Sequence, residues 1–442
     1  MNAIATTDTA VDLALARLTQ WTFTNPATGE EIVKPLMQHP DGVYIGLPQL
    51  DYLRDWALSY SAFKTILSSP PDWHWESPFN IVEEKTRQQT PALRFGEALH
   101  CALLERDEED KGILPKVFFE RFGTPPDEKS HPKALRTIPE IKGWLESKGQ
   151  KPVAKVWDEE NLKDRAAVKR DWIEQALKFD PKVQILDVLV DLWKADGMVE
   201  LSQEQIDKLS LMVTLATRHP DLVQAFSGVG LSEVSVFWTD VNDIRQRARF
   251  DRMKPNASID LKSFSNWQGR DFHKALLREA ALRMYDLQAA HYDVARHETK
   301  RLVEEGKVFF CHEVLLTDEE IDAYIVENDL SRKPDDRPVG LKRTVIEPAT
   351  EEQMELVRAV VCTDVWEWIW IFYKTDGAPT AQPIRFDRET KAFKRGMEYR
   401  DTALAHFIHY REIFGLTEMW MRLERMWTPD DEDWPFFMTN DL

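Results

Sequence analysis

The stretch SEVSVFWTDVNDIRQRARFDRMKPNASIDLKSF, residues 232–264, decides the fold of this chain. Three runs within it alternate in polarity: SEVSVFW at 232–238, RQRARFDRM at 245–253 and SIDLKSF at 258–264. Alternation with a period of two is typical of half-buried β-strands. The segments Val241-Asn242-Asp243 and Pro255-Asn256-Ala257 supply turn residues between the runs. The sequence therefore predicts three consecutive strands joined by turns.

Helical and strand patterns continue on both sides of these three runs. Residues 202–218 have helical periodicity, and a long stretch from about Arg270 to Glu305 is free of Gly and Pro, which predicts one long helix. The run VFFCHEVLL at 308–316 is typical of a fourth strand. Helix, three strands, helix and strand in this order predict an α/β core with a mixed central sheet flanked by helices.

The rest of the chain is assigned around that core. Residues 1–45 are interpreted as an N-terminal arm, and residues 46–316 as the core, with a charged helical insertion at about 106–200. Residues 317–442 are interpreted as a C-terminal extension that packs on the core, with two helical stretches in 350–425. Its alternating tryptophans could be core, an oligomer interface or a docking surface, and core packing is the preferred interpretation: Trp366, Trp368 and Trp370.

Charge restricts how this chain could bind nucleic acid. The chain of 442 residues is 43% hydrophobic, enough for a core, and its net charge is −19. Affinity for phosphates comes mainly from Lys and Arg, so nucleic acid must enter a local basic channel. Such a local excess exists, although solvated strand and helix faces would explain it equally well: Arg245, Arg247, Arg249, Arg252, Lys254, Lys262, Arg270, Lys274 and Arg278. Of these, Arg249, Arg252 and Arg270 are the candidate DNA contacts.

Other classes are disfavoured by what the sequence lacks. The apolar run at 365–373 is about half the length of a bilayer span, and the N-terminus has no secretory signal pattern, so we expect a cytoplasmic protein. The three cysteines stand far apart, which supports neither a disulfide framework nor a clustered metal site: Cys101, Cys311 and Cys362. No P-loop motif occurs, so the chain is not expected to carry its own ATP-driven motor.

Two carboxylates and a lysine form the candidate catalytic centre. Asp260 and Lys262 are two apart on a predicted strand and therefore share a face, and Asp251 ends the preceding strand. Carboxylates hold the hard divalent cations that assist phosphodiester hydrolysis, and an ammonium group can hold water or stabilise developing charge. The same acidic-x-Lys triplet also occurs at 83–85, 127–129 and 389–391, so its strand setting is what distinguishes this copy.

Helical residues on either side of the strands are candidates for the same site. Gln288 and Tyr292 are four apart and face one way on the predicted helix, although an exposed Gln288 and a core Tyr292 would give the same pattern. His100 lies on a helix one turn after Gly96. A helical glycine costs about 1 kcal/mol, which suggests that a backbone or ligand approaches there. The neutral imidazole of His100 could complete a metal shell.

Four ordered motifs together resemble one family. GEALH, ARFDRM, IDLKSF and QAAHY are similar to the G-x-x-x-H, Asp, (D/E)-x-K and Q-x-x-x-Y motifs of the RecB-type PD-(D/E)XK nucleases. The likeness is closest to the RecE branch, exonuclease VIII, and related phage exonucleases, and it covers about residues 59–314. LSYSAFKTILSSP at 58–70, SEVSVFW and, weakly, DWPFF at 433–437 add to it. Phe250 stands where many relatives have Pro, and Asp260 replaces the commoner Glu.

The resemblance implies a restriction-endonuclease-like core and a role for each matched residue. The metal ligands would be His100, Asp251, Asp260 and the Leu261 carbonyl. Lys262 would be the catalytic lysine, and Gln288 and Tyr292 would steady the scissile strand. Two further roles are implied for Glu233, which would serve a second metal ion, and for Ser61, which would meet a 5′ phosphate.

The function implied by the resemblance is a Mg²⁺- or Mn²⁺-dependent DNA exonuclease. It would degrade double-stranded DNA from 5′ to 3′ and leave 3′ single strands for annealing recombination. The likeness also implies a ring-shaped homo-oligomer on DNA ends and a single-strand annealing protein as a possible partner. Two alternatives use the same fold: an endonuclease or single-strand nuclease, and a non-catalytic DNA-binding or assembly protein.

Overall fold

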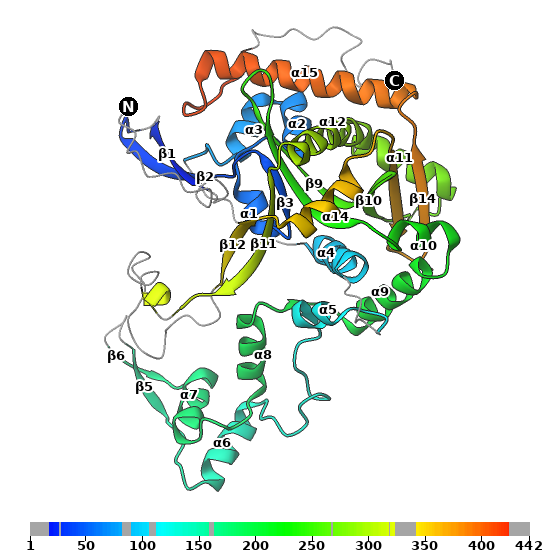
Figure 1. Ribbon diagram of the computed structural model, residues 1–442. Helices are drawn as coiled ribbons and strands as arrows, with labels where there is room; N and C mark the ends of the chain where they lie inside the picture. Colours follow the sequence, from blue (N-terminus) through cyan, green and yellow to red (C-terminus); the bar gives the residue numbers. More distant parts are fainter. Residues whose placement is uncertain are drawn as a thin grey trace, which may run out of the picture. The chain divides into compact units, whose positions relative to one another are not determined.

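The computed structural model describes residues 17–25, 28–81, 90–105, 112–158, 163–266, 268–317, 319–322 and 342–423 (Figure 1). The DWPFF run at 433–437 lies outside the described residues. The chain divides into two compact units. The first comprises Met1–Gln88, Ser227–Gly377 and Gln382–Leu442, and the second comprises Gln89–Phe226 and Ala378–Ala381. Each unit is described by itself.

A mixed eight-stranded sheet is the centre of the first unit, which confirms the predicted α/β class. Its strand order is β12-β11-β3-β8-β9-β10-β13-β14. Two pairings are parallel, β11 with β3 and β10 with β13, and those of β3, β8, β9 and β10 in sequence are antiparallel. The strands are β3 (Gly42–Ile45), β8 (Leu231–Thr239), β9 (Arg245–Lys254), β10 (Ala257–Phe264), β11 (Val308–Leu315), β12 (Lys342–Pro348), β13 (Glu367–Lys374) and β14 (Ala381–Phe386).

The strands predicted at 232–264 and 308–316 are confirmed as β8, β9, β10 and β11. β8 and β9 pair from Leu231↔Met253 to Thr239↔Arg245, and the turn between them contains Asp243 with a φ of 56°. β9 and β10 pair from Ala257↔Lys254 to Ile259↔Arg252. This last pair lies just before Asp260.

Segments outside the predicted core at 46–316 also enter the central sheet, from the predicted arm at 1–45 and the predicted extension at 317–442. β3 lies between β11 and β8, and β13 runs beside β10. The sequence separation of these partners hides the pairing from a local reading. The three tryptophans are buried, which confirms core packing: Trp366 is 5% exposed, Trp368 7% and Trp370 3%.

Helices α12 and α14 cover the sheet with a continuous apolar core. Ala295 and Leu302 of α12 and Val357 of α14 pack with Phe250 of β9 and Phe372 of β13. The bounds of the helices that follow β10 are α11 (Phe272–Leu282), α12 (Tyr285–Glu304), α14 (Glu351–Val361) and α15 (Lys391–Phe414).

The single helix predicted from about Arg270 to Glu305 is wrong, because it is two helices. Met284 separates α11 from α12 and adopts a left-handed backbone, with φ 57° and ψ 45°. A left-handed residue interrupts the α-helical hydrogen-bond series and is unfavourable for a side chain other than glycine. Neither Gly nor Pro marks the break, so the sequence gives no local sign of it.

The ends of the first unit pack around α15 in a second apolar cluster. Phe63 and Ile66 of α2, Trp73 of α3 and Phe407 and Tyr410 of α15 meet there. The hairpin of β1 (Arg17–Thr24) and β2 (Glu31–Gln38) also contributes to this cluster. The first three helices of the unit are α1 (Gln49–Arg54), α2 (Tyr60–Ser68) and α3 (Pro70–Glu76).

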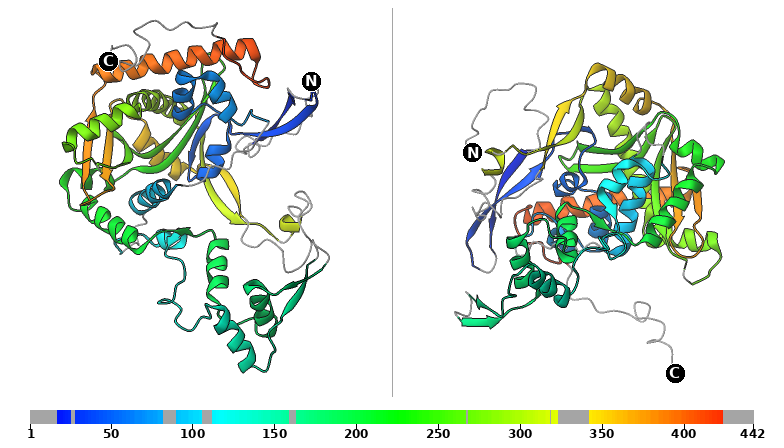
Figure 2. Two further views of the ribbon diagram at one scale, coloured as in Figure 1. Left: turned by 180° about the vertical axis from the view of Figure 1, so that it is seen from behind. Right: turned by 90° about the horizontal axis from the view of Figure 1, so that it is seen from below.

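Helix α15 runs against α12 (Figures 1 and 2), and Gly396 lies against the backbone of the first turn of α12. A Cβ at Gly396 would lie 2.2 Å from the backbone oxygen of Asp286, in the first turn of α12. One residue earlier on α15, Arg395 binds the Asp286 carboxylate through Nε at 2.8 Å and Nη2 at 2.7 Å. This contact fixes the beginning of α12.

The second unit is mainly helical and contains a small core of its own. Ile141 and Leu145 of α6 pack there with Trp172 and Ala176 of α7 and with Ile185. The unit extends beyond the insertion predicted at about 106–200. Its elements are α4 (Pro91–Leu104), α5 (Lys116–Arg121), β4 (Phe122–Gly123), α6 (Ile138–Ser147), β5 (Lys155–Asp158), β6 (Lys163–Ala166), α7 (Lys169–Phe179), α8 (Leu186–Ala195), β7 (Val199–Glu200), α9 (Gln203–Ala216) and α10 (Pro220–Phe226).

No helix in the described ranges is both long enough and apolar enough to cross a bilayer.

We expect Gly396→Ala to lower the free energy of unfolding by about 1 to 3 kcal/mol, because the added methyl group must push α15 away from α12. Urea denaturation of the full chain measures this change. Gly143→Ala in α6 is the matched control, since a Cβ there would meet no described atom within 4 Å. That substitution should be neutral or stabilise by up to about 1 kcal/mol. Equal effects of both changes would contradict the close approach.

Candidate functional site

An ion pair on β10 lies at the centre of the candidate site. Lys262 Nζ is 2.6 Å from Asp260 Oδ2, as the two-residue spacing on a strand predicts. The Asp260 side chain is 4% exposed and that of Lys262 is 17% exposed. A buried carboxylate is unfavourable unless it is paired and hydrogen-bonded, so the lysine is needed for this placement.

Gln288 of α12 completes the binding of Asp260. Its Nε2 donates to Asp260 Oδ1 at 2.8 Å, and the residue is 4% exposed. This contact settles the choice left open by the sequence, because an exposed Gln288 would not reach the strand. The Oε1 atom of the same amide is buried and has no hydrogen-bond partner among the described residues. A buried acceptor of this kind is uncommon and marks a place where a water or a substrate hydrogen could bind.

Asp251 lies where β9 and β10 stop pairing. Its Oδ2 accepts a hydrogen bond from the Leu261 amide at 2.7 Å. A side-chain carboxylate therefore accepts from this amide at the point where the paired strands end. The Asp251 carboxylate also raises the pKa of Lys262. Asp251 therefore lies near the ion pair of Asp260 and Lys262.

Glu233 of β8 is brought to the same point. A carboxylate oxygen of Glu233 and one of Asp251 lie within 4.8 Å of each other. Glu233 falls between the register pairs Ser232↔Arg252 and Val234↔Phe250, and its φ is 53°. Such a conformation costs about 1 to 2 kcal/mol for a residue with a Cβ and is found mainly at functional sites.

Arg249 holds the strained glutamate in place. Its Nε donates to Glu233 Oε2 at 2.7 Å, and its Nη1 donates to the Leu47 carbonyl at 2.7 Å and to Ser235 Oγ at 2.9 Å. The side chains of Arg249 and Glu233 are 16% and 19% exposed. The guanidinium of Arg249, a predicted DNA contact, is directed to Glu233.

The other two candidate DNA contacts differ from each other. Arg252 donates from Nη1 to Ser232 Oγ at 3.0 Å and from Nη2 to the Gly228 carbonyl at 3.2 Å. Burial lowers the pKa of Arg252. Arg270 is exposed, and its side chain is therefore the most accessible of the three predicted contacts.

Tyr292 supports the strand rather than the carboxylates. Its hydroxyl donates to the Arg249 carbonyl at 2.9 Å, and its ring packs on Phe250 with centroids 5.1 Å apart. Burial raises the pKa of Tyr292 well above 10.0, so the phenol is a neutral donor. Phe250 is therefore part of the apolar core of the first unit.

Two tyrosines that the sequence analysis did not assign to the site lie near its charged residues: Tyr285 near Lys262 and Tyr60 near Asp260. The Lys262 ammonium lies 4.9 Å from the ring centre of Tyr285, the first residue of α12. Tyr60 of α2 donates to the Arg283 carbonyl. Burial raises the pKa of both phenols, with Asp260 contributing to each. Tyr285 lies one turn before Gln288 on the same helix face, and that spacing was the available signal.

Lys262 remains an ammonium in this setting. Burial alone would lower its pKa, but the Asp260 and Asp251 carboxylates outweigh this effect, and the pKa of Lys262 is raised above 10.5. The group is therefore a positively charged donor at neutral pH rather than a base.

His100 and Ser61 are placed as follows. His100 is a half-buried residue of α4, in the second unit, so its part in the site stays a prediction. A Cβ at Gly96 would meet no described atom within 4 Å. The close backbone that we inferred from this glycine is therefore absent from the described residues. Ser61 is exposed on α2, and its Oγ lies 2.8 Å from Ser59 Oγ.

No family model and no curated protein matches this chain. The interpretation of the site rests on its own residues. Glu233, Asp251 and Asp260 come from three neighbouring strands, and their oxygen atoms are the ligands that Mg²⁺ and Mn²⁺ prefer. The Glu233 and Asp251 carboxylates lie near enough to each other to share one ion. The residues therefore fit a hard divalent cation.

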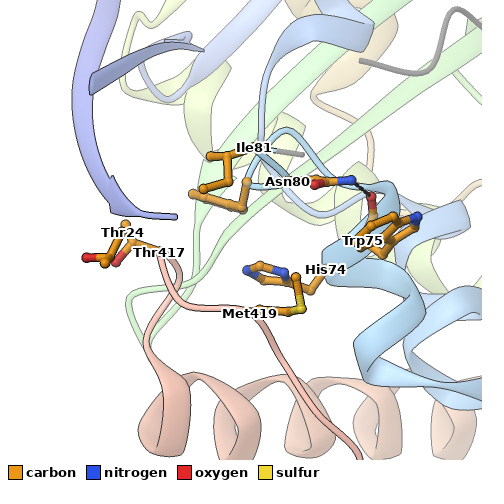
Figure 3. Close-up of a pocket in the computed structure, with 8 residues that line it drawn as sticks. Thr24, His74, Trp75, Asn80, Ile81, Thr417 and Met419 are labelled. Carbon is orange, nitrogen blue, oxygen red and sulfur yellow. Dashed lines mark hydrogen bonds between the residues drawn. The ribbon is translucent and has the colours of Figure 1, made fainter. Parts of the chain in front are cut away.

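A hollow elsewhere in the first unit lacks this chemistry (Figure 3). The lining has no carboxylate and consists of Thr24, His74, Trp75, Phe79, Asn80, Ile81, Thr417 and Met419. The imidazole of His74 is held at 3.0 Å from the Leu416 carbonyl and is stacked on Trp420. Its position indicates a role in packing the end of α15 against α3.

The strain at Glu233 can be isolated by comparing two truncations of this residue. Both Glu233→Gly and Glu233→Ala remove the carboxylate, but only glycine accepts a φ of 53° without a steric penalty. We expect the glycine variant to be more stable than the alanine variant by about 1 kcal/mol in urea denaturation. An alanine variant as stable as the glycine variant would show that no strain is present.

His291 predicts a pH dependence of stability. The imidazole is fully buried, its Nε2 lies 2.9 Å from the Arg247 carbonyl, and burial lowers its pKa to about 3. Between pH 6.5 and 3 the unfolded chain therefore binds a proton that the folded chain does not. The free energy of unfolding should fall with decreasing pH by up to about 1.4 kcal/mol per unit from this residue, with no contribution above pH 6.5.

Urea denaturation at pH 7 and pH 5 tests this dependence in the wild type and in His291→Gln. The glutamine variant lacks the titrating group, so its stability should change less between the two pH values. Other groups titrate equally in both proteins and cancel in the comparison. Identical changes in both proteins would rule out the depressed pKa.

Proposed function

We propose that this protein is a metal-dependent DNA nuclease whose centre is formed by Glu233, Asp251, Asp260 and Lys262. The observation that carries the proposal is the buried contact set on β10, in which Asp260 binds Lys262 Nζ at 2.6 Å and Gln288 Nε2 at 2.8 Å. An acidic-x-Lys triplet on the surface is solvated by water, so it needs neither burial nor a hydrogen bond from a neighbouring helix. A restriction-endonuclease-like fold, with its mixed sheet and flanking helices, is part of the same proposal.

The proposed metal ligands are the carboxylates of Glu233 and Asp251, which lie within 4.8 Å of each other, and that of Asp260. The Leu261 carbonyl and the imidazole of His100 are further ligands that the motif resemblance implies. A bound Mg²⁺ or Mn²⁺ ion would neutralise charge on the phosphate and make a water molecule more acidic. Aspartate at position 260 is one methylene shorter than glutamate, so the ion must lie close to β10.

The protein's own groups would position the reactants. Lys262 is a protonated donor beside Asp260 and can hold the attacking water or stabilise charge that develops on the phosphate. Gln288 fixes Asp260, and its buried Oε1, for which the described ranges supply no hydrogen-bond donor, is a further acceptor. Tyr292 fixes the β9 backbone, and Arg249 fixes Glu233. In the reaction the attacking water would lose one proton to solvent as its oxygen bonds to phosphorus, the bond to the leaving sugar oxygen would break, and that oxygen would take up a proton from solvent.

Exonuclease action on double-stranded ends is the finer proposal, and it rests on the motif resemblance alone. That resemblance is also the basis for the 5′-to-3′ polarity, the 3′ single strands for annealing recombination, the ring-shaped homo-oligomer and the annealing partner. The order of GEALH, ARFDRM, IDLKSF and QAAHY supports it.

The lysine provides the sharpest test of catalysis. We expect Lys262→Ala to degrade end-labelled linear duplex in Mg²⁺ at least about 100-fold more slowly than the wild type, because the charged donor is lost. The matched control is Lys129→Ala, which removes an exposed lysine from the triplet at 127–129 and should leave the rate unchanged. Equal rates for the wild type and Lys262→Ala would overturn the proposed site.

Linear and covalently closed circular DNA should be compared in the same assay. An exonuclease leaves the closed circle intact, whereas cleavage of the circle would assign an endonuclease to the same residues. Labels at either end, with and without a 5′ phosphate, give the polarity and test Ser61. A wild type that binds DNA but cleaves none of these substrates in Mg²⁺ or Mn²⁺ would favour the non-catalytic alternative.

A further inference from the structure

One face of α11 combines exposed cations with exposed leucines. Lys274 and Arg278 are four residues apart and therefore project from the same side of the helix. Leu277 and Leu282 share this side, at 60% and 64% exposure. Leu276, on the opposite side, is fully buried and anchors α11 to the core. We refer to the side with Lys274, Leu277, Arg278 and Leu282 as the outer face of α11.

The cations of this region have no acidic partners among the described residues. Arg270, Lys274 and Arg278 are all exposed. The two acidic residues within 270–282 are engaged elsewhere: Asp271 caps the helix by accepting from the Lys274 amide at 3.0 Å, and Glu279 binds Arg283 at 2.9 Å. A cluster of uncompensated cations is notable in a chain whose net charge is −19.

The end of α11 is connected directly to the candidate site. The Arg283 carbonyl, just past the helix, accepts from Tyr60. Met284 then turns the chain into α12, whose first residue, Tyr285, lies 4.9 Å below the Lys262 ammonium. The outer face therefore begins beside the site and extends along a helix of 11 residues, which is about 16 Å long.

We infer that the outer face of α11, together with Arg270, binds a single DNA strand that enters or leaves the site. The cations would contact phosphates along the strand, and Leu277 and Leu282 would pack against unstacked bases. Lys274 and Arg278 are about 6 Å apart along the helix axis, close to two nucleotide steps of about 3.4 Å. Apolar side chains such as leucine are used by proteins to contact bases whose stacking is broken. This inference rests on the proposed nuclease function.

The combination of charge and exposed leucine selects this occupant. A blunt duplex stacks its bases and would leave both leucines in water, whereas a single strand offers base faces as well as phosphates. An acidic protein or an anionic membrane would also attract the cations, and each is treated as an outcome that would overturn the inference.

The charges are tested by the salt dependence of binding. The full chain is titrated into a fluorescein-labelled single-stranded oligonucleotide in EDTA, where binding is separated from cleavage, and anisotropy is measured from 50 to 200 mM salt. The triple variant is Arg270→Gln, Lys274→Gln, Arg278→Gln. Since three phosphate contacts are lost, we expect the negative slope of log K against log salt to become shallower by about 2. Affinity at 50 mM salt should fall at least about tenfold.

The control for this measurement is Arg54→Gln on α1. The Arg54 side chain is 66% exposed, and α1 is far from α11 in the sequence. It removes one surface charge and should leave both slope and affinity close to those of the wild type. An unchanged slope in the triple variant would overturn the inference. So would loss of binding to phosphatidylserine vesicles with DNA binding intact, since the surface would then serve a membrane.

The leucines provide an independent test. Leu277→Ser with Leu282→Ser should weaken binding to the single strand several-fold and leave the salt slope unchanged, because no phosphate contact is lost. Binding to a duplex closed by hairpins at both ends should change less. Equal losses for both substrates, or none for the single strand, would refute base packing.

Cleavage assays in Mg²⁺ keep the two proposals apart. A wild type that cleaves DNA, with α11 variants that bind and cleave as well as it does, would refute the α11 inference and leave the nuclease proposal standing. A wild type that binds the single strand through α11 but cleaves nothing would refute the nuclease proposal instead. Capture of the α11 face by an acidic polypeptide, with DNA binding unaffected by the triple variant, would also overturn the inference.

Discussion

One buried hydrogen bond, from Gln288 Nε2 to Asp260 Oδ1, joins the helical layer of the first unit to the strand that carries the site. An unpaired carboxylate at this depth would lose several kcal/mol of solvation, so β10 can place Asp260 here only while Lys262 and Gln288 satisfy it. Gln288 in turn depends on the beginning of α12, which is fixed by the close approach of Gly396 to the Asp286 backbone. A helix near the C-terminus thus determines how well a strand 130 residues earlier is arranged, and the geometry of the centre is a tertiary property.

Charge in this protein is used first for internal positioning and only then for contact with a ligand. Arg249 is half-buried. It donates to Glu233, which has an unfavourable backbone conformation, and also to the Leu47 carbonyl and to Ser235. Carboxylates from three strands repel one another at this site. The guanidinium of Arg249, held on β9, offsets part of that negative charge. The consequence is that few of the arginines in β9 remain for a substrate, and cations elsewhere must supply that contact.

The sequence predicted the features that depend on local spacing and missed those that depend on distant partners. Period-two alternation identified β8, β9 and β10, two-residue spacing placed Asp260 beside Lys262, and four-residue spacing placed Gln288 on the correct face. The pairings of β3 and β13 join segments far apart in sequence, which periodicity cannot reveal. The break at Met284 has no Gly or Pro to mark it, and Arg249 turns inward because of Glu233, a residue on another strand. Tyr285 was visible as a helical neighbour of Gln288, but only its contact with Lys262 gives it a role.

The position of β13 has a consequence for how the chain is made. β10 lies between β9 and β13, and the parallel pairing with β13 joins residues 257–264 to residues 367–374. A ribosome must therefore complete about a hundred further residues after β10 before that strand acquires its second neighbour. Until then β10 is an open edge that can pair with other chains, and such late pairing of distant segments is slow. The nascent protein therefore carries its acidic residues early, but β10 can be paired on both sides only after residue 374 has been synthesised.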